Sequence, residues 1–213
     1  MRLYKYIKKE HLDSFFSQGR VKIGSLYEYR NVEQYGNVIG DHMEGAFETI
    51  LDRSGPYDID LSTDSIESLL FRQNLDIDRR DIKITVEAGA SIAFRQESPD
   101  FYIYCVTTDF NQNVMKEFDC DCCIEIINPE LFFKALSEKI RHKAQWQLAS
   151  KIAYRSKYTS YTQPHKFHQV ITKSPEYAYQ NELRGIWKPK GEIKSPLIVD
   201  VPKAIGACRI YKF

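Results

Sequence analysis

The chain has 213 residues, of which 43% are hydrophobic and 28% charged, enough apolar material for one domain with a full core. Its 30 basic and 29 acidic side chains give a net charge of +1, which excludes a global field attracting nucleic acid or a membrane surface. The sequence contains no apolar run of transmembrane length and no signal-peptide pattern at its N-terminus, so we expect no membrane partner. The five cysteines, an odd number, predict reduced thiols in a cytoplasmic protein.

The N-terminal segment predicts a strand, a helix and a second strand, followed by a loop. Residues 2–7 have strand character, and a short helix over 11–16 ends at Gly19, which suits a left-handed cap. Residues 20–30 return to strand character. Residues 31–45 hold three glycines and several titratable side chains without clear periodicity. A loop of this length in a compact domain is typical of a functional segment.

The middle of the chain is dominated by strand patterns. Alternating or β-rich runs predict strands over residues 46–53, 82–88, 91–95, 101–107 and 122–128. Residues 56–65 resemble an acidic turn, residues 67–74 fit a helix or a strand, and residues 108–118 form a polar connection. Residues 54–95 are therefore a candidate insertion into a single domain that covers residues 1–213.

The C-terminal part begins with the clearest helix signal. Asn128 suits the N-cap, Pro129 suits the first turn, and a periodic apolar face follows to residue 140. Further strands are predicted around 151–155 and over 176–187, 196–201 and 207–213, with a polar stretch at 156–164. Strands with few helices and no regular alternation predict an α+β fold with a mostly antiparallel sheet.

The segment 176–187, EYAYQNELRGIW, carries polar residues within a strand-like pattern. If it is extended, Gln180, Glu182 and Arg184 point to one face. Arg184 could then pair with Glu182 and keep that carboxylate ionised. Either these side chains form a solvated edge with a structural ion pair, or they form a polar site on the sheet.

The sequence does not favour either of two chemistries based on cysteine. Cys120, Cys122 and Cys123 with His165 and His168 contain zinc-ligand types, but the C-x-C-C spacing lies in a strand where neighbouring side chains face opposite ways. Buried thiols and no metal are therefore expected. A nucleophilic Cys105 with either histidine has no local support, since Cys105 lies within a strand at a position suited to a small apolar residue.

Two further segments are candidate ligand contacts. The loop that follows Arg30 contains Asp41 and Glu44 among its glycines. Acidic side chains accept hydrogen bonds from ribose, and Arg pairs with phosphate, although an ordered surface loop would have the same composition. Thr107 and Thr108 place hydroxyls at the end of the strongest strand pattern, where ligand-orienting groups often lie.

Taken together, these segments resemble the ADP-ribosyltransferase fold, in its toxin-like branch. The opening LYKYIKKEHLDSFFSQGRVKIGSL is similar to the strand–helix–strand unit of that family, Val106–Thr108 to its Ser-Thr-Ser motif, and Gln180-Asn181-Glu182 to its Q/E-x-E motif. The chain also resembles a group of poorly characterised bacterial and phage proteins with a YR…GD…EG loop and an E-x-R strand. The first resemblance implies a split, mostly antiparallel sheet and NAD as substrate.

Carried over to this sequence, the resemblance implies a catalytic Glu182 with Gln180 as the upstream member of its motif. It implies that Thr107 and Thr108 support the nicotinamide half of NAD, and that the first-strand position falls to Lys5 or Arg2. Tyr6, the neighbour of Lys5, is assigned with it to the NAD site. Breaking the nicotinamide–ribose bond builds positive charge on the ribose, which a carboxylate stabilises. We assign Tyr27 and Arg30, which flank the start of the loop, to the same NAD site.

One stretch of the sequence is a candidate for contact with the acceptor. The stretch Lys151–Lys173 is rich in basic and aromatic residues and contains no acidic residue, a composition that suits single-stranded nucleic acid. For a transferase that modifies a protein or nucleic acid, we predict Arg155, Lys157, Tyr158 and Tyr161 on the acceptor side. The resemblance also implies a toxin or phage-defence role and a neutralising antitoxin partner. The alternative is a catalytically silent nucleotide- or nucleic-acid-binding module on the same scaffold.

Overall fold

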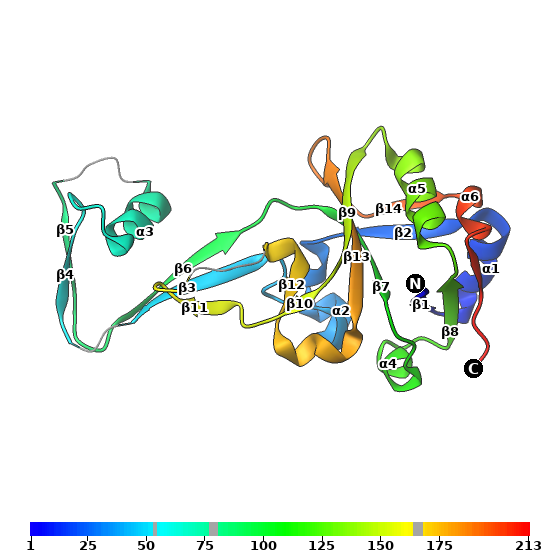
Figure 1. Ribbon diagram of the computed structural model, residues 1–213, viewed down its shortest axis with the longest axis horizontal. Coiled ribbons are helices and arrows are strands. Elements are labelled where there is room, and N and C mark those ends of the chain that lie inside the picture. The colour runs from blue at the N-terminus through cyan, green and yellow to red at the C-terminus, as the bar shows by residue number, and fades with distance from the viewer. Residues whose placement is uncertain (53–54, 77–80, 164–167) are drawn as a thin grey trace.

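The computed structural model describes residues 1–52, 55–76, 81–163 and 168–213. It has two regions, a body that carries both chain termini and a long arm that projects from the body (Figure 1). The arm consists of residues 46–97, and the rest of the chain is called the body. The described residues form an α+β structure in which most strand pairs are antiparallel, as predicted.

An eight-stranded sheet forms the centre of the body, and all of its strand pairs are antiparallel. Its strands are β1 (Leu3–Ile7), β2 (Arg20–Ser25), β7 (Tyr102–Thr107), β8 (Cys122–Ile126), β9 (Ala144–Lys151), β13 (Glu182–Pro189), β14 (Leu197–Asp200) and β15 (Cys208–Ile210). The order is β14-β2-β7-β1-β8-β15, with β13 beside β7 and β9 beside β13.

Strand β7 is the strand at which the sheet divides. One edge of β7 pairs with β13 along its whole length. The other edge pairs with β2 at Tyr102 and Ile103 and with β1 only at Thr107. Among the described strands, none pairs with residues 104–106 on that edge, because β1 and β2 diverge there. This divergence creates an opening in the sheet.

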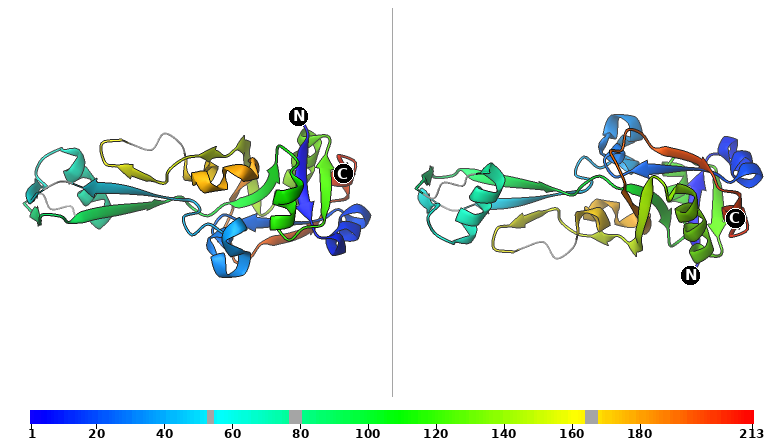
Figure 2. Two further views of the ribbon diagram at one scale, coloured as in Figure 1. Left: turned by 90° about the horizontal axis from the view of Figure 1, so that it is seen from below. Right: turned by 90° about the horizontal axis from the view of Figure 1, so that it is seen from above.

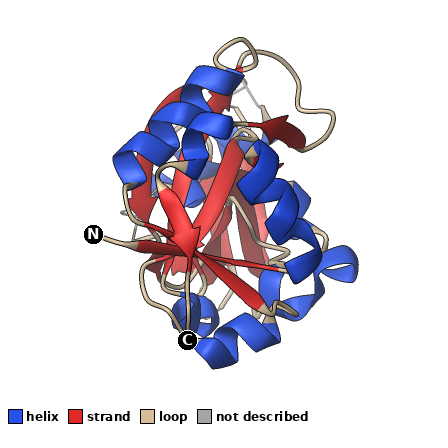
Figure 3. Ribbon diagram, turned by 90° about the vertical axis from the view of Figure 1, so that its right-hand side faces the viewer, coloured by secondary structure: helices blue, strands red, loops and turns tan. Residues whose placement is uncertain are grey.

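Short helices surround the sheet of the body (Figure 3). They are α1 (Lys9–Gln18), η1 (Glu28–Arg30), α2 (Val32–Ile39), α4 (Gln112–Glu117), α5 (Pro129–Ile140), η2 (Gln169–Ile171), η3 (Pro175–Gln180) and α6 (Pro202–Ile205), where η denotes a 3-10 helix. A small parallel pair, β10 (Ala153–Tyr154) and β12 (Thr172–Lys173), lies beside η3. Helices α1, α5 and α6 contribute to the main core on one face of the sheet, and α4 packs on the opposite face.

Two helix ends follow the predicted capping chemistry. Gly19 adopts a left-handed conformation with φ 71° and ends α1 by donating its N–H to the carbonyl of Phe15. A Cβ at this position would lie 2.2 Å from the carbonyl oxygen of Val201, so the packing also requires glycine. At the start of α5, the side chain of Asn128 accepts a hydrogen bond from the N–H of Leu131 at 3.1 Å. Both capping predictions are confirmed.

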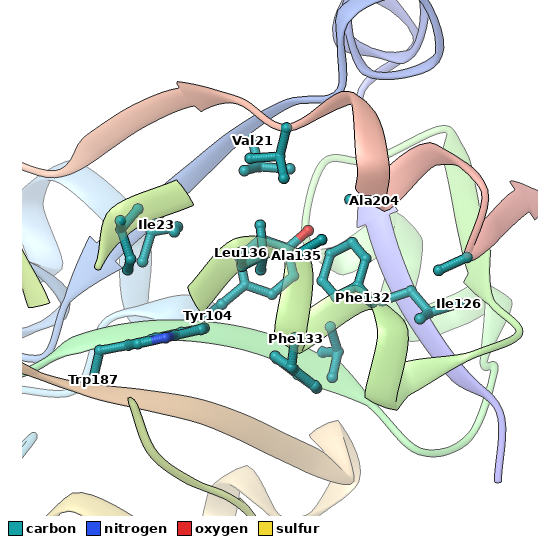
Figure 4. Close-up of a cluster of buried hydrophobic side chains, with 14 of the residues drawn as sticks. Val21, Ile23, Tyr104, Ile126, Phe132, Phe133, Ala135, Leu136, Trp187 and Ala204 are labelled. Carbon is teal, nitrogen blue, oxygen red and sulfur yellow. The ribbon is translucent and has the colours of Figure 1, made fainter. Parts of the chain in front are cut away.

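The main core lies between α5 and the sheet (Figure 4). Phe132 packs against Tyr104 of β7, with ring centroids 5.4 Å apart. Phe133 packs over Gly185 of β13, where an added Cβ would approach its ring to 2.4 Å. The indole N–H of Trp187 donates to the hydroxyl of Ser137 at 2.8 Å, which satisfies its polar atom within the core. This packing fixes β7 and β13, the strands that carry the site.

The arm is an antiparallel pair that ends in a small module of its own (Figure 2). Its elements are β3 (Ala46–Asp52), β4 (Tyr57–Asp60), α3 (Ile66–Leu75), β5 (Lys83–Val86) and β6 (Ser91–Glu97). Strand β3 pairs with β6 and also, in parallel, with β11 (Tyr158–Ser160). We call the described residues of 55–90 the tip. The candidate insertion at 54–95 lies within the arm.

Several predicted loops and strands have a different structure. The strand predicted over 20–30 ends at Ser25 and is followed by η1. The loop predicted over 31–45 contains α2, which is kinked at Gly36 with φ 66°. The connection at 108–118 contains α4, and the turn at 56–65 contains β4. Both missed helices begin at an asparagine whose side chain accepts backbone N–H groups, Asn31 and Asn111, so a capping signal was present without a long apolar face.

The segment 176–187, predicted as one strand, is only partly a strand. Residues 175–180 form η3, Asn181 is left-handed with φ 44°, and β13 begins at Glu182. Gln180 therefore does not share a strand face with Glu182 and Arg184. Glu182 and Arg184 do share a face of β13, as the alternation predicts.

Candidate functional site

A cavity of about 570 Å³ lies in the opening between β1 and β2. Its walls are largely apolar, and five tyrosines line it: Tyr4, Tyr6, Tyr29, Tyr35 and Tyr104. Its polar lining includes five side chains that are bonded to one another: Glu44, Lys173, Gln180, Glu182 and Arg184. We call the four charged members, Glu44, Lys173, Glu182 and Arg184, the charge network.

Glu182 is held at the start of β13, next to the end of β7. It pairs in register with Thr107, and its backbone N–H donates to the hydroxyl of Tyr154 at 2.7 Å. Its side chain is only 6% exposed and accepts from Arg184 Nε at 2.5 Å and from Lys173 Nζ at 3.0 Å. Burial alone would raise the pKa of Glu182, but Arg184 and Lys173 outweigh burial and hold that pKa well below its usual value. Glu182 is therefore ionised at neutral pH.

Arg184 connects Glu182 to the loop that precedes the arm. Its two terminal nitrogens donate to the two carboxylate oxygens of Glu44 at 2.8 and 2.9 Å, a bidentate geometry. The same guanidinium donates to the carbonyl of Val170 at 2.9 Å. The network thus contains two carboxylates and two cations, so its formal charges cancel. The predicted pairing of Arg184 with Glu182 is present.

Gln180 joins the network through Lys173 and not through strand alternation. Its side-chain oxygen accepts from Lys173 Nζ at 2.7 Å, while its amide nitrogen donates to the carbonyl of Val38 at 2.6 Å. The hydroxyl of Tyr177 also donates to the carbonyl of Gly40, at 2.9 Å. These two bonds fasten η3 to α2, two of whose residues, Tyr35 and Ile39, line the cavity. Both functional groups of Gln180 are therefore already bonded within the protein.

Cys105 lies on β7 beside Glu182 and lines the cavity. Burial and the neighbouring Glu182 carboxylate raise the pKa of its thiol to about 12. The protonated thiol is a poor nucleophile at neutral pH, which argues against the cysteine chemistry considered above. His168 caps η2, where its Nδ1 accepts from the N–H of Val170, and His165 lies outside the described residues.

The cysteine cluster contains reduced thiols that face different surroundings. Cys123 is fully buried, whereas Cys120 and Cys122 are half-buried. Within the described parts of the chain, no group of three or more His, Cys, Asp or Glu side chains is arranged to hold a metal ion.

Three of the six predicted NAD contacts line the cavity, namely Lys5, Tyr6 and Thr107. The ammonium of Lys5 donates to the carbonyl of Cys105 at 2.9 Å and lies 5.0 Å from the ring centroid of Tyr104. Over the described residues, no carboxylate forms an ion pair with Lys5. Lys5 is thus a cation available to an anionic ligand. Thr108 is outside the lining and bonds to the carbonyl of Asn181 at 3.3 Å.

Tyr27 and Arg30 are outside the cavity lining and stabilise the base of the arm. The guanidinium of Arg30 lies over the ring of Tyr27, 3.7 Å from its centroid. Arg30 donates to the carbonyl of Glu44 at 2.6 Å and to Glu97 at 3.1 Å, and the hydroxyl of Tyr27 donates to the carbonyl of Ser98. Arg30 is therefore bonded at the base of the arm and is not brought to the cavity with Lys5, Tyr6 and Thr107.

The four predicted acceptor residues have different environments. Lys157 is fully buried, and its ammonium donates to Asp41 at 2.8 Å and to the carbonyl of Met43 at 2.6 Å. Its assignment to the acceptor side is therefore wrong, because the side chain is buried and its ammonium is paired with Asp41. Arg155 and Tyr158 are exposed, and Tyr161 packs against the core of the tip. Lys173, at the end of the same stretch, belongs to the buried network.

Sequence reasoning missed two members of the network. For Glu44 the sequence indicates a candidate ligand contact in a glycine-rich loop but no pairing with Arg184, and its place in the GD…EG pattern is the signal for it. Lys173 had no local signal, because its partners become visible only when β12 is placed beside η3 and β13. Both residues are charged and buried, and clusters of buried charged side chains beside a cavity commonly mark functional sites.

No protein-family model, curated protein or solved structure matches the chain. None of the helices in the described residues is long and apolar enough to cross a membrane. The function is therefore argued from the geometry of the cavity and its charged residues.

Proposed function

We propose that the chain transfers ADP-ribose from NAD to an acceptor macromolecule, with Glu182 as the catalytic carboxylate. The observation that carries this proposal is an ionised, buried carboxylate at a tyrosine-lined cavity in the divided sheet. The three segments that carry the resemblance to ADP-ribosyltransferases also meet there. Tyr4 of β1 pairs with Thr107 of β7, and Thr107 pairs on its other edge with Glu182.

The chemistry follows from the charges of the site. The bond between nicotinamide and ribose breaks with its electron pair on nicotinamide, and positive charge develops on the ribose. Glu182 would stabilise that charge, and a nucleophile of the acceptor would form the new bond to the ribose and lose its proton. Lys5, which has no carboxylate partner in the described chain, would pair with the diphosphate of NAD. The tyrosine rings would stack on the planar groups of the ligand.

A catalytically silent nucleotide-binding module is the second candidate. It is favoured by the bonds of Glu182, since one carboxylate oxygen accepts from Arg184 and the other from Lys173. A ligand would have to share or displace these partners. In this second candidate the cavity and Lys5 would bind a nucleotide, and the charge network would only shape the site.

NAD turnover by the purified full chain separates these candidates. We expect nicotinamide release that falls at least about a hundredfold in Glu182→Gln, because the charge that stabilises the transition state is lost. Glu125→Gln is the matched control, since Glu125 is also buried, pairs with Arg2 and Arg209, and is outside the cavity lining. NAD that raises the melting temperature but stays intact would favour the silent module. A chain that neither binds nor consumes NAD would contradict the transferase, and a chain that binds no other nucleotide either would contradict the silent module as well.

A further inference from the structure

The tip of the arm is a separately packed module. Its core is formed by buried apolar side chains of the arm: Leu51, Ile59, Leu61, Phe71, Val86 and Phe94. The rings of Phe71 and Phe94 meet edge to face with centroids 5.0 Å apart. The seven-residue strand β3 spans about 20 Å, so the tip stands well clear of the body (Figure 2). A module held this far out contributes no wall to the cavity.

Helix α3 leaves large apolar side chains in solvent. Ser68 and Phe71 face the core of the tip and are buried, whereas Ile66, Leu69 and Leu75 are 53%, 41% and 53% exposed. Ile66 and Leu69 are three positions apart and therefore neighbours on the helix surface. Ile66, Leu69 and Leu75 do not belong to the core of the tip. Grouped exposed apolar residues on a module of this size are typical of a contact surface.

The charge of the tip selects between the classes of partner. The described residues of the tip contain seven acidic and two basic side chains, a net charge of −5, whereas the whole chain carries +1 and its remainder therefore +6. Three of the acidic residues, Asp64, Glu67 and Asp76, lie in or beside α3. A surface of this sign repels the phosphates of nucleic acid and attracts basic groups.

Three ion pairs lie at the base of the arm, and one of them belongs to the charge network. Strand β3 begins two positions after Glu44, which binds Arg184, and Gly45 turns the chain between them with φ 69°. Strand β11 begins one position after Lys157, which pairs with Asp41 at 2.8 Å. Strand β6 ends at Glu97, which pairs with Arg30 at 3.1 Å. A partner held by the tip is therefore held in a defined position relative to the cavity.

We propose that the tip docks a protein whose contact surface combines basic and apolar side chains, with Ile66 and Leu69 at the centre of the contact. Basic groups of the partner complement the net charge of −5, and its apolar groups cover the exposed residues of α3. That this docked protein is also the acceptor of ADP-ribose rests on the proposed function. The docking itself does not depend on it.

Selection of random displayed peptides on the immobilised full chain tests the docking. We expect selected peptides to be enriched in Lys and Arg together with Leu, Ile, Phe or Trp, and to bind more weakly as salt is raised. In the double variant Ile66→Ser and Leu69→Ser, binding of these peptides should fall by about tenfold or more. The control is Ile127→Ser with Ile210→Ser, because both residues are exposed in the body. Hydrogen exchange of β4 and β5 verifies that the tip remains folded in the double variant.

Several outcomes would overturn the docking proposal. They are selected peptides without basic residues, peptides whose binding the double variant leaves unchanged, and a single-stranded oligonucleotide that binds the wild type but not the double variant. Sedimentation that shows a dimer dissociated by the double variant would instead make this face an interface between two copies. NAD hydrolysis without acceptor should be equal in wild type and double variant. If neither consumes NAD while peptide docking persists, the proposed function fails and the docking stands.

Discussion

The charge network of the body and the core of the tip both exclude water, but they bury different chemistry. The network buries four charged side chains, whereas the core of the tip is built mainly from apolar side chains and contains no charged member of its cluster. Burying apolar surface stabilises a fold at roughly 25 cal/mol per Å². Burying ion pairs gives little net stability, because desolvation offsets most of the attraction. Stability therefore explains the core of the tip and leaves the network unexplained, which is why we assign function to the network.

The two regions also differ in how far apart their partners lie in the sequence. Glu44 and Arg184 are 140 positions apart, and their bidentate bond forms only when the N-terminal and C-terminal parts of the chain are folded together. The buried residues that form the core of the tip all lie within residues 51–94, and Tyr161 packs against them from outside. We therefore expect the tip to fold as a local unit and the site to depend on the whole body. Three experiments test this difference, from the largest expected effect to the smallest.

Arg184→Met should have the largest effect, and it should be global. The substitution leaves the buried carboxylates of Glu44 and Glu182 without their shared guanidinium. Breaking one partner of a buried ion pair typically costs about 3–5 kcal/mol, and two carboxylates lose a partner here. Urea denaturation should therefore show a large decrease in the free energy of unfolding of the body.

Arg20→Met is the matched control for this variant, since Arg20 pairs with Asp200 at the surface. Its free energy of unfolding should stay near that of the wild type, because solvent screens exposed ion pairs. If Arg184→Met were as stable as Arg20→Met, the buried network would not persist in solution, and the contrast between the two regions would disappear.

Phe71→Ala should have a smaller and local effect. Removing the ring that packs on Phe94 leaves a cavity in the tip, at a cost of about 3 kcal/mol. Hydrogen exchange should become faster in β4, α3 and β5, while β7 and β13 keep their protection. Phe132→Ala, in the main core, is the control, and it should instead make hydrogen exchange faster in the strands of the body. Equal loss of protection in both regions after Phe71→Ala would show that the arm and the body unfold together.

The elements that the sequence predicts well have local causes. The ends of α1 and α5 depend on Gly19 and Asn128, and both act within one turn of their helix. The strands β1, β7, β8 and β13 have strong apolar or aromatic patterns that persist in the sheet. The pairing of Glu182 with Arg184 was also predictable, because alternation on one strand places the two side chains together.

What the sequence could not predict depends on distant partners. Lys173 lies in a basic aromatic stretch that resembles an exposed surface, yet it is buried against Glu182 and Gln180. Lys157 belongs to the same stretch and is buried against Asp41. Their burial follows from the placement of β11 beside β3 and of β12 beside η3, which no local pattern encodes. The segment that ends at Gln180 was predicted as a strand because tyrosines favour strands, but Pro175 begins a 3-10 helix there.

The smallest expected effect concerns the pH dependence of stability, which reports directly on Glu182. Its pKa in the folded protein lies well below the usual value of 4.5, because Arg184 and Lys173 outweigh burial. Above pH 4.5 the carboxylate is ionised in both states, and its full stabilising contribution is present. As the pH falls below that value, the unfolded chain binds the proton first, and the contribution is lost progressively until the folded pKa is reached.

Glu182→Gln should therefore flatten the decline of stability below pH 4.5, although this variant is less stable than the wild type at neutral pH. Urea denaturation at a series of pH values measures the slope. Glu97→Gln is the control, because Glu97 is 38% exposed and its pairs with Arg30 and Arg95 are screened by solvent. Its slope should stay close to that of the wild type. Equal slopes for wild type and Glu182→Gln would mean that the pKa of Glu182 is the same in the folded and the unfolded chain, which would contradict its pairing with Arg184 and Lys173 in the folded protein.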